Sequence, residues 1–167
     1  MGDRICLCEE GDRESIYSVI NEAATAYEGV IPPDRYEQPY MEMGELSEEM
    51  DKMTFYGHRG ASPEEGLVGV MAIQPLDRVT LIRHAYVIPP YQRKGVGSRL
   101  LNKLEELAET DRLLVGTWKA ACWAIRFYRE HGFRRIDNPR RCLKKYWNVP
   151  ERQIETSTVL EKRLSED

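Results

Sequence analysis

The sequence lacks any apolar run approaching ~20 residues, the length that a membrane-spanning helix requires. Its opening residues, Met-Gly-Asp-Arg, also lack the apolar stretch of a secretory signal. We therefore expect a cytoplasmic protein with no membrane partner. Basic residues are scarce as well, since 24 Lys and Arg stand against 28 Asp and Glu and give a formal net charge of −4. This balance argues against a nucleic-acid partner, which usually requires a basic face, and it favours cationic small substrates.

Cysteine is sparse, with four residues in the chain. Cys6 and Cys8 have the spacing of one strand face, but a tetrahedral metal site would need two more ligands close by. Cys122 and Cys142 stand alone and far away in the sequence. We expect four reduced thiols of a cytosolic protein and no metal site.

The length of 167 residues is enough for one core, and a hydrophobic fraction of 41% argues against disorder, so we expect a single domain, 1–167. Hydrophobic periodicity predicts strands at 5–8, 53–58, 66–74, 80–87, 113–116, 133–136 and 154–160. It predicts helices after Asp12 and at 43–53, 98–110, 120–131 and 139–147. This order indicates an α/β fold, with a mixed and mostly antiparallel sheet of about six to seven strands and helices on both faces.

One stretch organises the rest of the chain: the strand Thr80 to Val87, a turn, and a helix from Ser98. Prolines follow the strand and end it, because proline cannot donate a ladder hydrogen bond. Gly95 and Gly97 then allow a sharp turn with bare amides, and a bare turn before a helix N-terminus favours an anion such as phosphate. An ordinary glycine turn between strand and helix is the alternative.

Two common phosphate motifs do not fit this turn. A dinucleotide fingerprint needs a third glycine where the chain has Leu100, and a P-loop needs Gly-Lys-Ser/Thr, which is absent. The segment 92–97, Gln-Arg-Lys-Gly-Val-Gly, instead resembles the acyl-CoA signature of the GNAT superfamily of N-acyltransferases. A second segment, 124–133, is similar to the family's Ala-x-x-x-Tyr-x-x-x-Gly-Phe motif. The predicted order of elements is similar to the GNAT fold over nearly the whole chain.

The resemblance implies that acetyl-CoA is the cosubstrate and that its pyrophosphate lies at the turn, on Gln92, Arg93, Lys94, Gly95, Val96, Gly97 and Ser98. It further implies that the backbone near Tyr86, Val87 and Ile88 pairs with the pantetheine arm and polarises the thioester carbonyl, in an oxyanion-hole role. The family often has an asparagine where this chain has Ala121, so the contact there is expected to be weaker or shifted.

Tyr128 is the candidate proton donor, because the tyrosine at this motif position in the family directs its hydroxyl at the CoA sulfur. A phenol with a pKa of about 10 can donate to a thiolate at neutral pH. The alternative is a core tyrosine on an apolar helix face.

The general base is less defined by the sequence. Many GNAT enzymes use a glutamate where this chain has Leu81. His84, on the same strand, suits the task near neutral pH, and Glu28 in the loop after the first helix is a second candidate. A hydrogen-bonded or exposed strand histidine, or a water chain without a dedicated base, are the alternatives.

The acceptor pocket is expected between the loop Tyr27 to Pro33 and His84. Arg83 should point to the face opposite His84, and if it instead faces the acceptor side it could bind a carboxylate of the substrate. Trp118 and Trp123 are either pocket or core residues. The acids of the second predicted helix are expected to form a solvated face: Glu42, Glu45, Glu48, Glu49 and Asp51.

The expected activity is transfer of an acetyl group from acetyl-CoA to a primary amine, on a small-molecule acceptor. Acetylation of a protein N-terminus or lysine is a further alternative within the same class. A CoA-binding sensor or interaction module with the same fold is the alternative from another class. A homodimer stays open.

Overall fold

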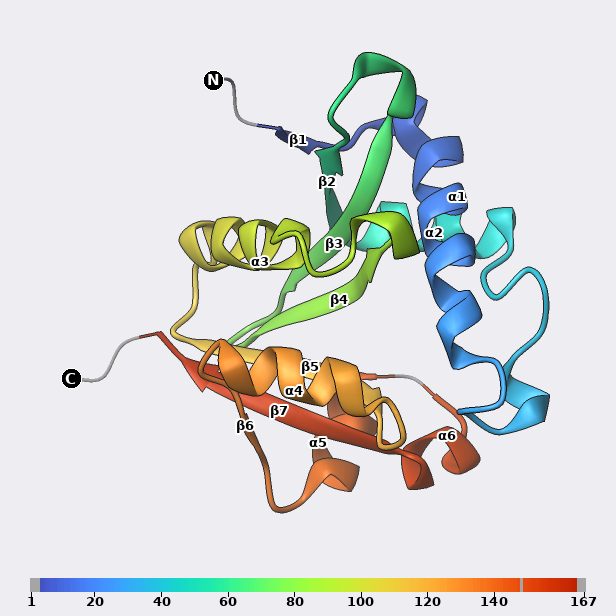
Figure 1. The fold of residues 1–167 in the computed structure, drawn as a ribbon. Helices are drawn as coiled ribbons and strands as arrows, with labels where there is room; N and C mark the ends of the chain where they lie inside the picture. Colours follow the sequence, from blue (N-terminus) through green and yellow to red (C-terminus); the bar gives the residue numbers. More distant parts are fainter. Residues whose placement is uncertain (1–3, 148, 165–167) are drawn as a thin grey trace.

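The computed structural model describes residues 4–147 and 149–164. Within these ranges, seven strands form one sheet in the order β1-β2-β3-β4-β5-β7-β6 (Figure 1). All neighbours are antiparallel except β4 and β5, which are parallel. The strands are β1 Ile5–Leu7, β2 Thr54–Arg59, β3 Leu67–Pro75, β4 Thr80–Val87, β5 Arg112–Trp118, β6 Arg134–Arg135 and β7 Ser157–Arg163. The mixed, mostly antiparallel sheet predicted from the sequence is confirmed.

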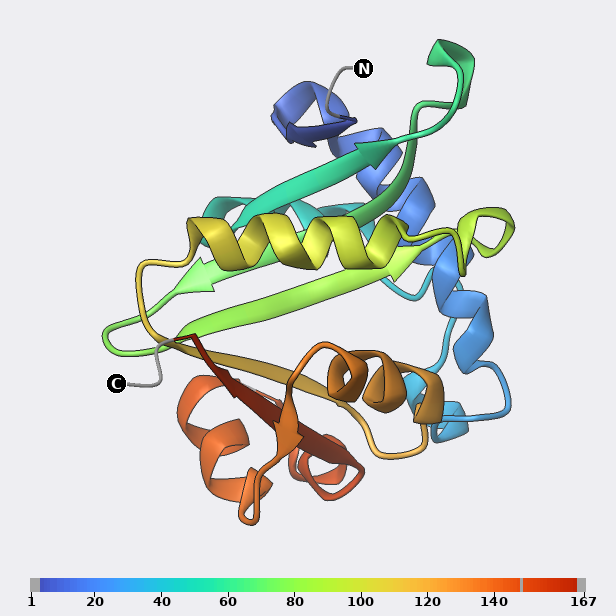
Figure 2. The ribbon, with the colours of Figure 1, turned by 60° about the vertical axis from the view of Figure 1, so that its left-hand side comes forward.

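Helices cover both faces of this sheet (Figure 2). Helices α1 and α2 pack over β2 and β3, and α5 and α6 cover the other end of the same face, next to β5 and β7. Helices α3 and α4 lie on the opposite face. Their bounds are α1 Arg13–Ala23, α2 Met43–Lys52, α3 Val96–Leu107, α4 Cys122–Glu130, α5 Pro139–Tyr146 and α6 Glu151–Glu155. None of the helices in the described ranges has the length and apolar character to cross a bilayer.

Helix α3 docks through the leucine stripe that its sequence predicts. Leu100, Leu101 and Leu104 are fully buried against the sheet, whereas Leu107 at the helix end is 39% exposed. Burial of one leucine side chain contributes about 1.5–3 kcal/mol, so these three contacts fix the position of the helix. The glycine turn that precedes α3 is thereby held against the end of β4.

The C-terminal segment differs from its prediction. The sequence predicted a strand from Ile154, but α6 continues to Glu155 and β7 begins at Ser157. The carbonyl of Pro150 accepts the N–H groups of Gln153 and Ile154, which closes a helical turn there. The β-branched residues around Ile154 suggested a strand, but this turn buries the isoleucine side chain against α5 and the sheet.

Strands β4 and β5 pair only over their first residues. Their register joins Thr80 to Leu113 and Ile82 to Val115, yet β4 continues to Val87 and β5 to Trp118. Figure 2 shows the two strands diverging toward their C-terminal ends. The later residues of β4 therefore have backbone groups on the β5 side that do not pair with β5.

A β-bulge interrupts β4 in this diverging part. Val70 and Ala72 of β3 pair with Tyr86 and Arg83, so His84 and Ala85 together stand opposite one residue of β3. His84 has a positive φ of 52°, the left-handed region that histidine adopts more readily than most residues. The extra residue breaks the alternation of side chains. The expectation that Arg83 points away from His84 is wrong, because both side chains contact the same oxygen of Glu49.

Candidate active site

The turn before α3 presents its backbone amides in the way the sequence predicts. Arg93 and Gly95 both have positive φ, at 64° and 85°, and Gly95 is the N-cap of α3. The first amide to enter the helical ladder is that of Arg99, which donates to the Gly95 carbonyl. The N–H groups before it open the helix and have no partner in its ladder. This geometry and the helix dipole together favour an anion.

Three side chains brace this turn. The Gln92 amide donates to the Val87 carbonyl at 3.0 Å and joins the turn to the end of β4. Arg99 donates to Nε2 of His58 at 2.9 Å and to the Lys94 carbonyl at 3.3 Å. The Phe127 ring of α4 packs on Gly97 so closely that a Cβ there would lie only 3.2 Å from the ring. The turn is therefore closely packed on its inner side, while Lys94 and Arg93 stay exposed to solvent.

The start of α3 is also tied to α4. Ser98 Oγ lies 2.8 Å from Nε2 of His131, and Nδ1 of His131 lies 2.7 Å from the Phe127 carbonyl. A carbonyl only accepts, so Nδ1 donates to it, and Nε2 and the serine hydroxyl share the second hydrogen bond. His131 therefore has a defined hydrogen-bonded position instead of a solvated one.

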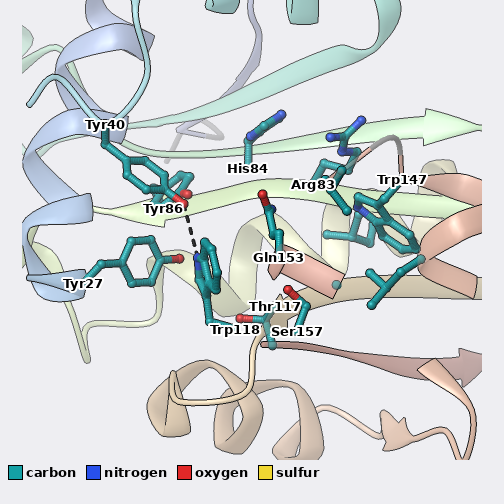
Figure 3. Close-up of a pocket in the computed structure, with 14 residues that line it drawn as sticks. Tyr27, Tyr40, Arg83, His84, Tyr86, Thr117, Trp118, Trp147, Gln153 and Ser157 are labelled. Atoms are coloured by element: carbon teal, nitrogen blue, oxygen red, sulfur yellow. Dashed lines mark hydrogen bonds between the residues drawn. The ribbon is translucent and has the colours of Figure 1, made fainter. Parts of the chain in front are cut away.

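A cavity of about 150 Å³ opens on the opposite face, between the diverging ends of β4 and β5 (Figure 3). Its floor comes from β4 and β5, and its walls come from the segments after α1 and α5 and from α6. The lining residues are Tyr27, Tyr40, Ile82, Arg83, His84, Tyr86, Gly116, Thr117, Trp118, Leu143, Trp147, Val149, Gln153 and Ser157.

Aromatic side chains form one end of this cavity. The ring of Tyr27 lies 5.3 Å from that of Tyr40 and 6.3 Å from that of Tyr86, and Trp118 donates from Nε1 to the Tyr40 hydroxyl at 3.2 Å. Burial raises the pKa of Tyr27, Tyr40 and Tyr86 above the ordinary value, so all three phenols are neutral at physiological pH. This end offers apolar surface and neutral hydroxyl groups.

The other end holds a compact charged group. Glu49 Oε1 lies 2.8 Å from Nε2 of His84 and 3.4 Å from Nη2 of Arg83. The hydrogen bond to His84 is the main reason that the pKa of Glu49 is lowered, so its carboxylate is ionised. Burial lowers the pKa of His84 and the bond to Glu49 partly opposes this, so the imidazole is neutral near pH 7. Its ring stacks on Phe55, at 5.6 Å between centroids.

Tyr128 lies on the other side of the sheet. It projects from α4 into the core beneath α3 and α4, and its ring contacts Phe133 edge to face at 5.4 Å. Burial, and next the nearby Tyr27, raise the pKa of Tyr128 above its ordinary value, so the phenol is protonated. Tyr27 lines the cavity, so Tyr128 is within electrostatic reach of one cavity residue.

A model of the acetyltransferase (GNAT) family matches residues 15–133, more than half of the chain. The chain belongs to the GNAT acetyltransferase family. The family resemblance inferred from the two sequence motifs is confirmed, and the chain is an acyltransferase by family.

Solved structures share the GNAT fold over nearly the full length. A GNAT-family acetyltransferase from Staphylococcus aureus Mu50 aligns with a TM-score of 0.72 and 18% identity, over 96% of this chain and 98% of the other. The PaiA N-acetyltransferase of Thermoplasma acidophilum, in complex with coenzyme A, gives 0.70 and 16% over 98% and 99%. The ribosomal-protein-S18-alanine N-acetyltransferase of Escherichia coli gives 0.69 and 16% over 98% and 94%. These likenesses establish the fold.

Two further family positions are occupied by apolar residues in this GNAT protein. Leu81, at the position where many members have a glutamate, is fully buried in the apolar cluster beneath α5 and α6. Ala121, at the usual asparagine, is the buried N-cap of α4. Neither position supplies a polar group to the site.

Some of the remaining predicted site residues line the cavity, and others do not. Tyr27 and His84 line it together, as expected, and Trp118 lines it as well. Residues 30–32 of the same loop and Trp118 line a second, more open hollow of about 350 Å³. Glu28 is exposed and does not line either hollow, and Trp123, 46% exposed, has its ring 6.1 Å from that of Tyr27.

Glu49 is a site residue that its sequence pattern did not predict. It was expected on a solvated face, but it is only 9% exposed because α2 turns this residue toward the β4 bulge. The one available signal was its spacing from Leu46, Met50 and Met53, which places it at the edge of the apolar stripe of α2.

Proposed function

We propose that this protein transfers the acetyl group of acetyl-CoA to a primary amine of a small-molecule acceptor. The observation that carries the proposal is the pair of sites joined by the gap between β4 and β5. A backbone anion site lies at one end of the gap, and an aromatic and polar cavity lies on the far face of the sheet. An acyl transferase needs this arrangement, because donor and acceptor must meet while each stays bound.

On the donor side, the amides of residues 93–98 would hold the pyrophosphate of CoA, with Arg93 and Lys94 adding charge beside it. The unpaired edge of β4 at Tyr86, Val87 and Ile88 would bind the pantetheine arm as a neighbouring strand does. An N–H group of this edge directed at the thioester oxygen would stabilise the negative charge that develops there.

The chemistry follows from the protonation states. The neutral amine attacks the thioester carbon, a C–N bond forms, and the C–S bond then breaks with its electron pair on sulfur. His84, neutral and hydrogen-bonded to Glu49, would accept the proton that the amine loses. The protonated phenol of Tyr128 would donate a proton to the departing thiolate.

His84 is favoured over Glu28 as the base. His84 lines the cavity and has an ionised carboxylate on Nε2, which holds the ring and stabilises the imidazolium that would form. The Nδ1 atom of His84 has no hydrogen-bond partner in the described chain and is free to receive a proton. Glu28 faces solvent and would reach the acceptor only through a moved loop.

We also propose a cytoplasmic location, since all four cysteines are unpaired in the structure, as in proteins of reducing compartments.

The test is release of free CoA thiol when the purified protein is mixed with acetyl-CoA and a panel of primary amines. Amine-dependent thiol release with formation of the N-acetyl product is the expected result. Binding of acetyl-CoA by calorimetry without release for any amine would instead favour the sensor or interaction module of the same fold.

A further inference from the structure

The charges that line the acceptor cavity differ from the charge of the whole chain. Among the described lining residues, Arg83 carries the permanent charge, and none of them is an aspartate, glutamate or lysine. Glu49 is close to Arg83, but it lies behind Arg83 and His84 and does not line the cavity. The excess of acidic residues in the chain, which favoured cationic substrates, therefore does not extend to the lining of this cavity. A polyamine or a lysine side chain would find no carboxylate here for a second ammonium group.

We propose that the acceptor is an amine that also carries a carboxylate and an apolar body, such as an α-amino acid of leucine size, and that Arg83 binds its carboxylate. This inference rests on the proposed acetyl transfer and names the class of acceptor for the same site.

Arg83 has donor capacity left for such a ligand. A guanidinium has five N–H donors in a planar fork that fits a carboxylate. In this structure Nη1 donates to Gln74 Oε1 at 3.3 Å, and Nη2 lies 3.4 Å from Glu49, which are both long contacts. The side chain is 20% exposed and lines the cavity, and Arg83 still pairs regularly with Ala72, just before the bulge.

The surroundings of Arg83 complete a site for an amino acid. Gln153 projects into the cavity between His84 and Thr117, and its side-chain amide has no hydrogen bond within the described residues (Figure 3). Leu143, Trp147 and Val149 provide apolar surface on the same side. A carboxylate at Arg83, donors at Gln153 and an apolar side chain over Trp147 would place the amine next to His84.

The charges of this cluster also balance during the proposed reaction. Glu49 neutralises Arg83, and His84 is neutral, so the group has no net charge before binding. The amino acid reacts as its neutral amine, with its carboxylate bound at Arg83. When His84 takes the proton that this amine loses on attack, the imidazolium compensates the bound carboxylate, and no unpaired charge remains in the cavity.

The experiment compares L-leucine with L-leucinamide and 3-methylbutylamine, which share its body but lack the carboxylate. With acetyl-CoA saturating, kcat/KM for L-leucine should exceed that for both analogues by about tenfold or more, because loss of a partner of a buried charge pair weakens binding strongly. The amide lowers the pKa of its neighbouring amine and so supplies more neutral amine. A preference for L-leucine over L-leucinamide therefore cannot come from a larger share of neutral amine, and this pair is the deciding comparison.

In Arg83→Gln this preference should collapse, with kcat/KM for L-leucine falling at least about tenfold further than the values for the analogues. Arg83→Lys keeps the charge without the planar fork, so its kcat/KM for L-leucine should lie between the values of wild type and Arg83→Gln. Arg78→Gln, on the exposed β3–β4 turn, is the matched control and should behave as wild type. Thermal unfolding shows whether the variants are folded.

Equal rates for L-leucine and its analogues, or equal losses for all three in Arg83→Gln and Arg83→Lys, would overturn the carboxylate site and leave acetyl transfer standing. If no amine releases thiol, the carboxylate site is tested without turnover, by titrating L-leucine into the protein with CoA present and measuring binding by calorimetry. Binding of L-leucine that Arg83→Gln and Arg83→Lys both weaken would support it, and absence of binding would overturn it.

Discussion

Nε2 of His131 and the Ser98 hydroxyl form a hydrogen bond of 2.8 Å, which joins the first turn of α3 to the end of α4. Helix α3 begins at the proposed pyrophosphate site, and α4 carries the proposed proton donor. The contact therefore fixes the distance between the two parts of the donor site. The Phe127 carbonyl holds the other nitrogen of the ring at 2.7 Å.

We predict that Ser98 and His131 are energetically coupled. Ser98→Ala and His131→Phe each remove the contact, and His131→Phe keeps a ring against Phe127. A double-mutant cycle on urea unfolding should give a coupling of about 0.5–1.5 kcal/mol, the usual net value of one hydrogen bond. Additive effects of the two substitutions would mean that the bond contributes nothing to stability.

We predict that Gly95→Val weakens acetyl-CoA binding. Gly95 has φ 85°, where a residue with a Cβ is strained by about 1–2 kcal/mol, so the turn should move and affinity should fall by roughly tenfold. Titration calorimetry measures the change. Gly44→Val is the control, since nothing lies within 4 Å of a Cβ there and the residue is on another helix. Unchanged affinity in Gly95→Val would remove the turn from the binding site.

We predict that Tyr128→Phe lowers kcat by about 100-fold, at the lower end for general acid catalysis because a thiolate is already a fair leaving group. Affinity for acetyl-CoA should be nearly intact, since the hydroxyl acts on charge that exists only as the thioester breaks. The ring remains against Phe133, so the core should hold.

The measurement for Tyr128 is steady-state kinetics with a verified acceptor, under conditions limited by the chemical step. Tyr146→Phe, which removes a hydroxyl on α5, is the control. If kcat of Tyr128→Phe stays within about twofold of wild type, Tyr128 is a core residue and not the acid.

We predict that Glu49→Gln moves the acid limb of the pH–rate profile. The bond to Glu49 raises the pKa of His84 against the lowering by burial and by Arg83, so its loss should lower that pKa further. Activity that needs neutral His84 falls as pH drops through this pKa, and the limb should therefore shift to lower pH. A weaker, less oriented base should also reduce the plateau by roughly tenfold or more.

The matched control for this change is Glu48→Gln, the same substitution at the neighbouring, exposed position of α2. Its pH profile of kcat/KM should coincide with that of wild type. Identical profiles for all three proteins would exclude His84 with Glu49 as the base.

Much of the donor side could be predicted from the sequence because its signals are local. Gly95 and Gly97 mark the turn, and Tyr128 follows from a contiguous motif on one helix. The acceptor side depends on contacts between distant segments. The bulge at His84 is not marked by glycine, and the burial of Glu49 arises only when α2 meets β4.

The early end of pairing between β4 and β5 has a consequence for stability. In the free protein, the later amides of β4 on the β5 side should exchange with solvent deuterium faster than those of its first three residues. The pantetheine arm of acyl-CoA, bound between β4 and β5, would connect the two halves of the sheet in the way that a paired strand does. Saturation with the cosubstrate should then slow exchange along β4 and β5 and raise the melting temperature of the whole domain, because ligand that binds only the native state favours it by mass action.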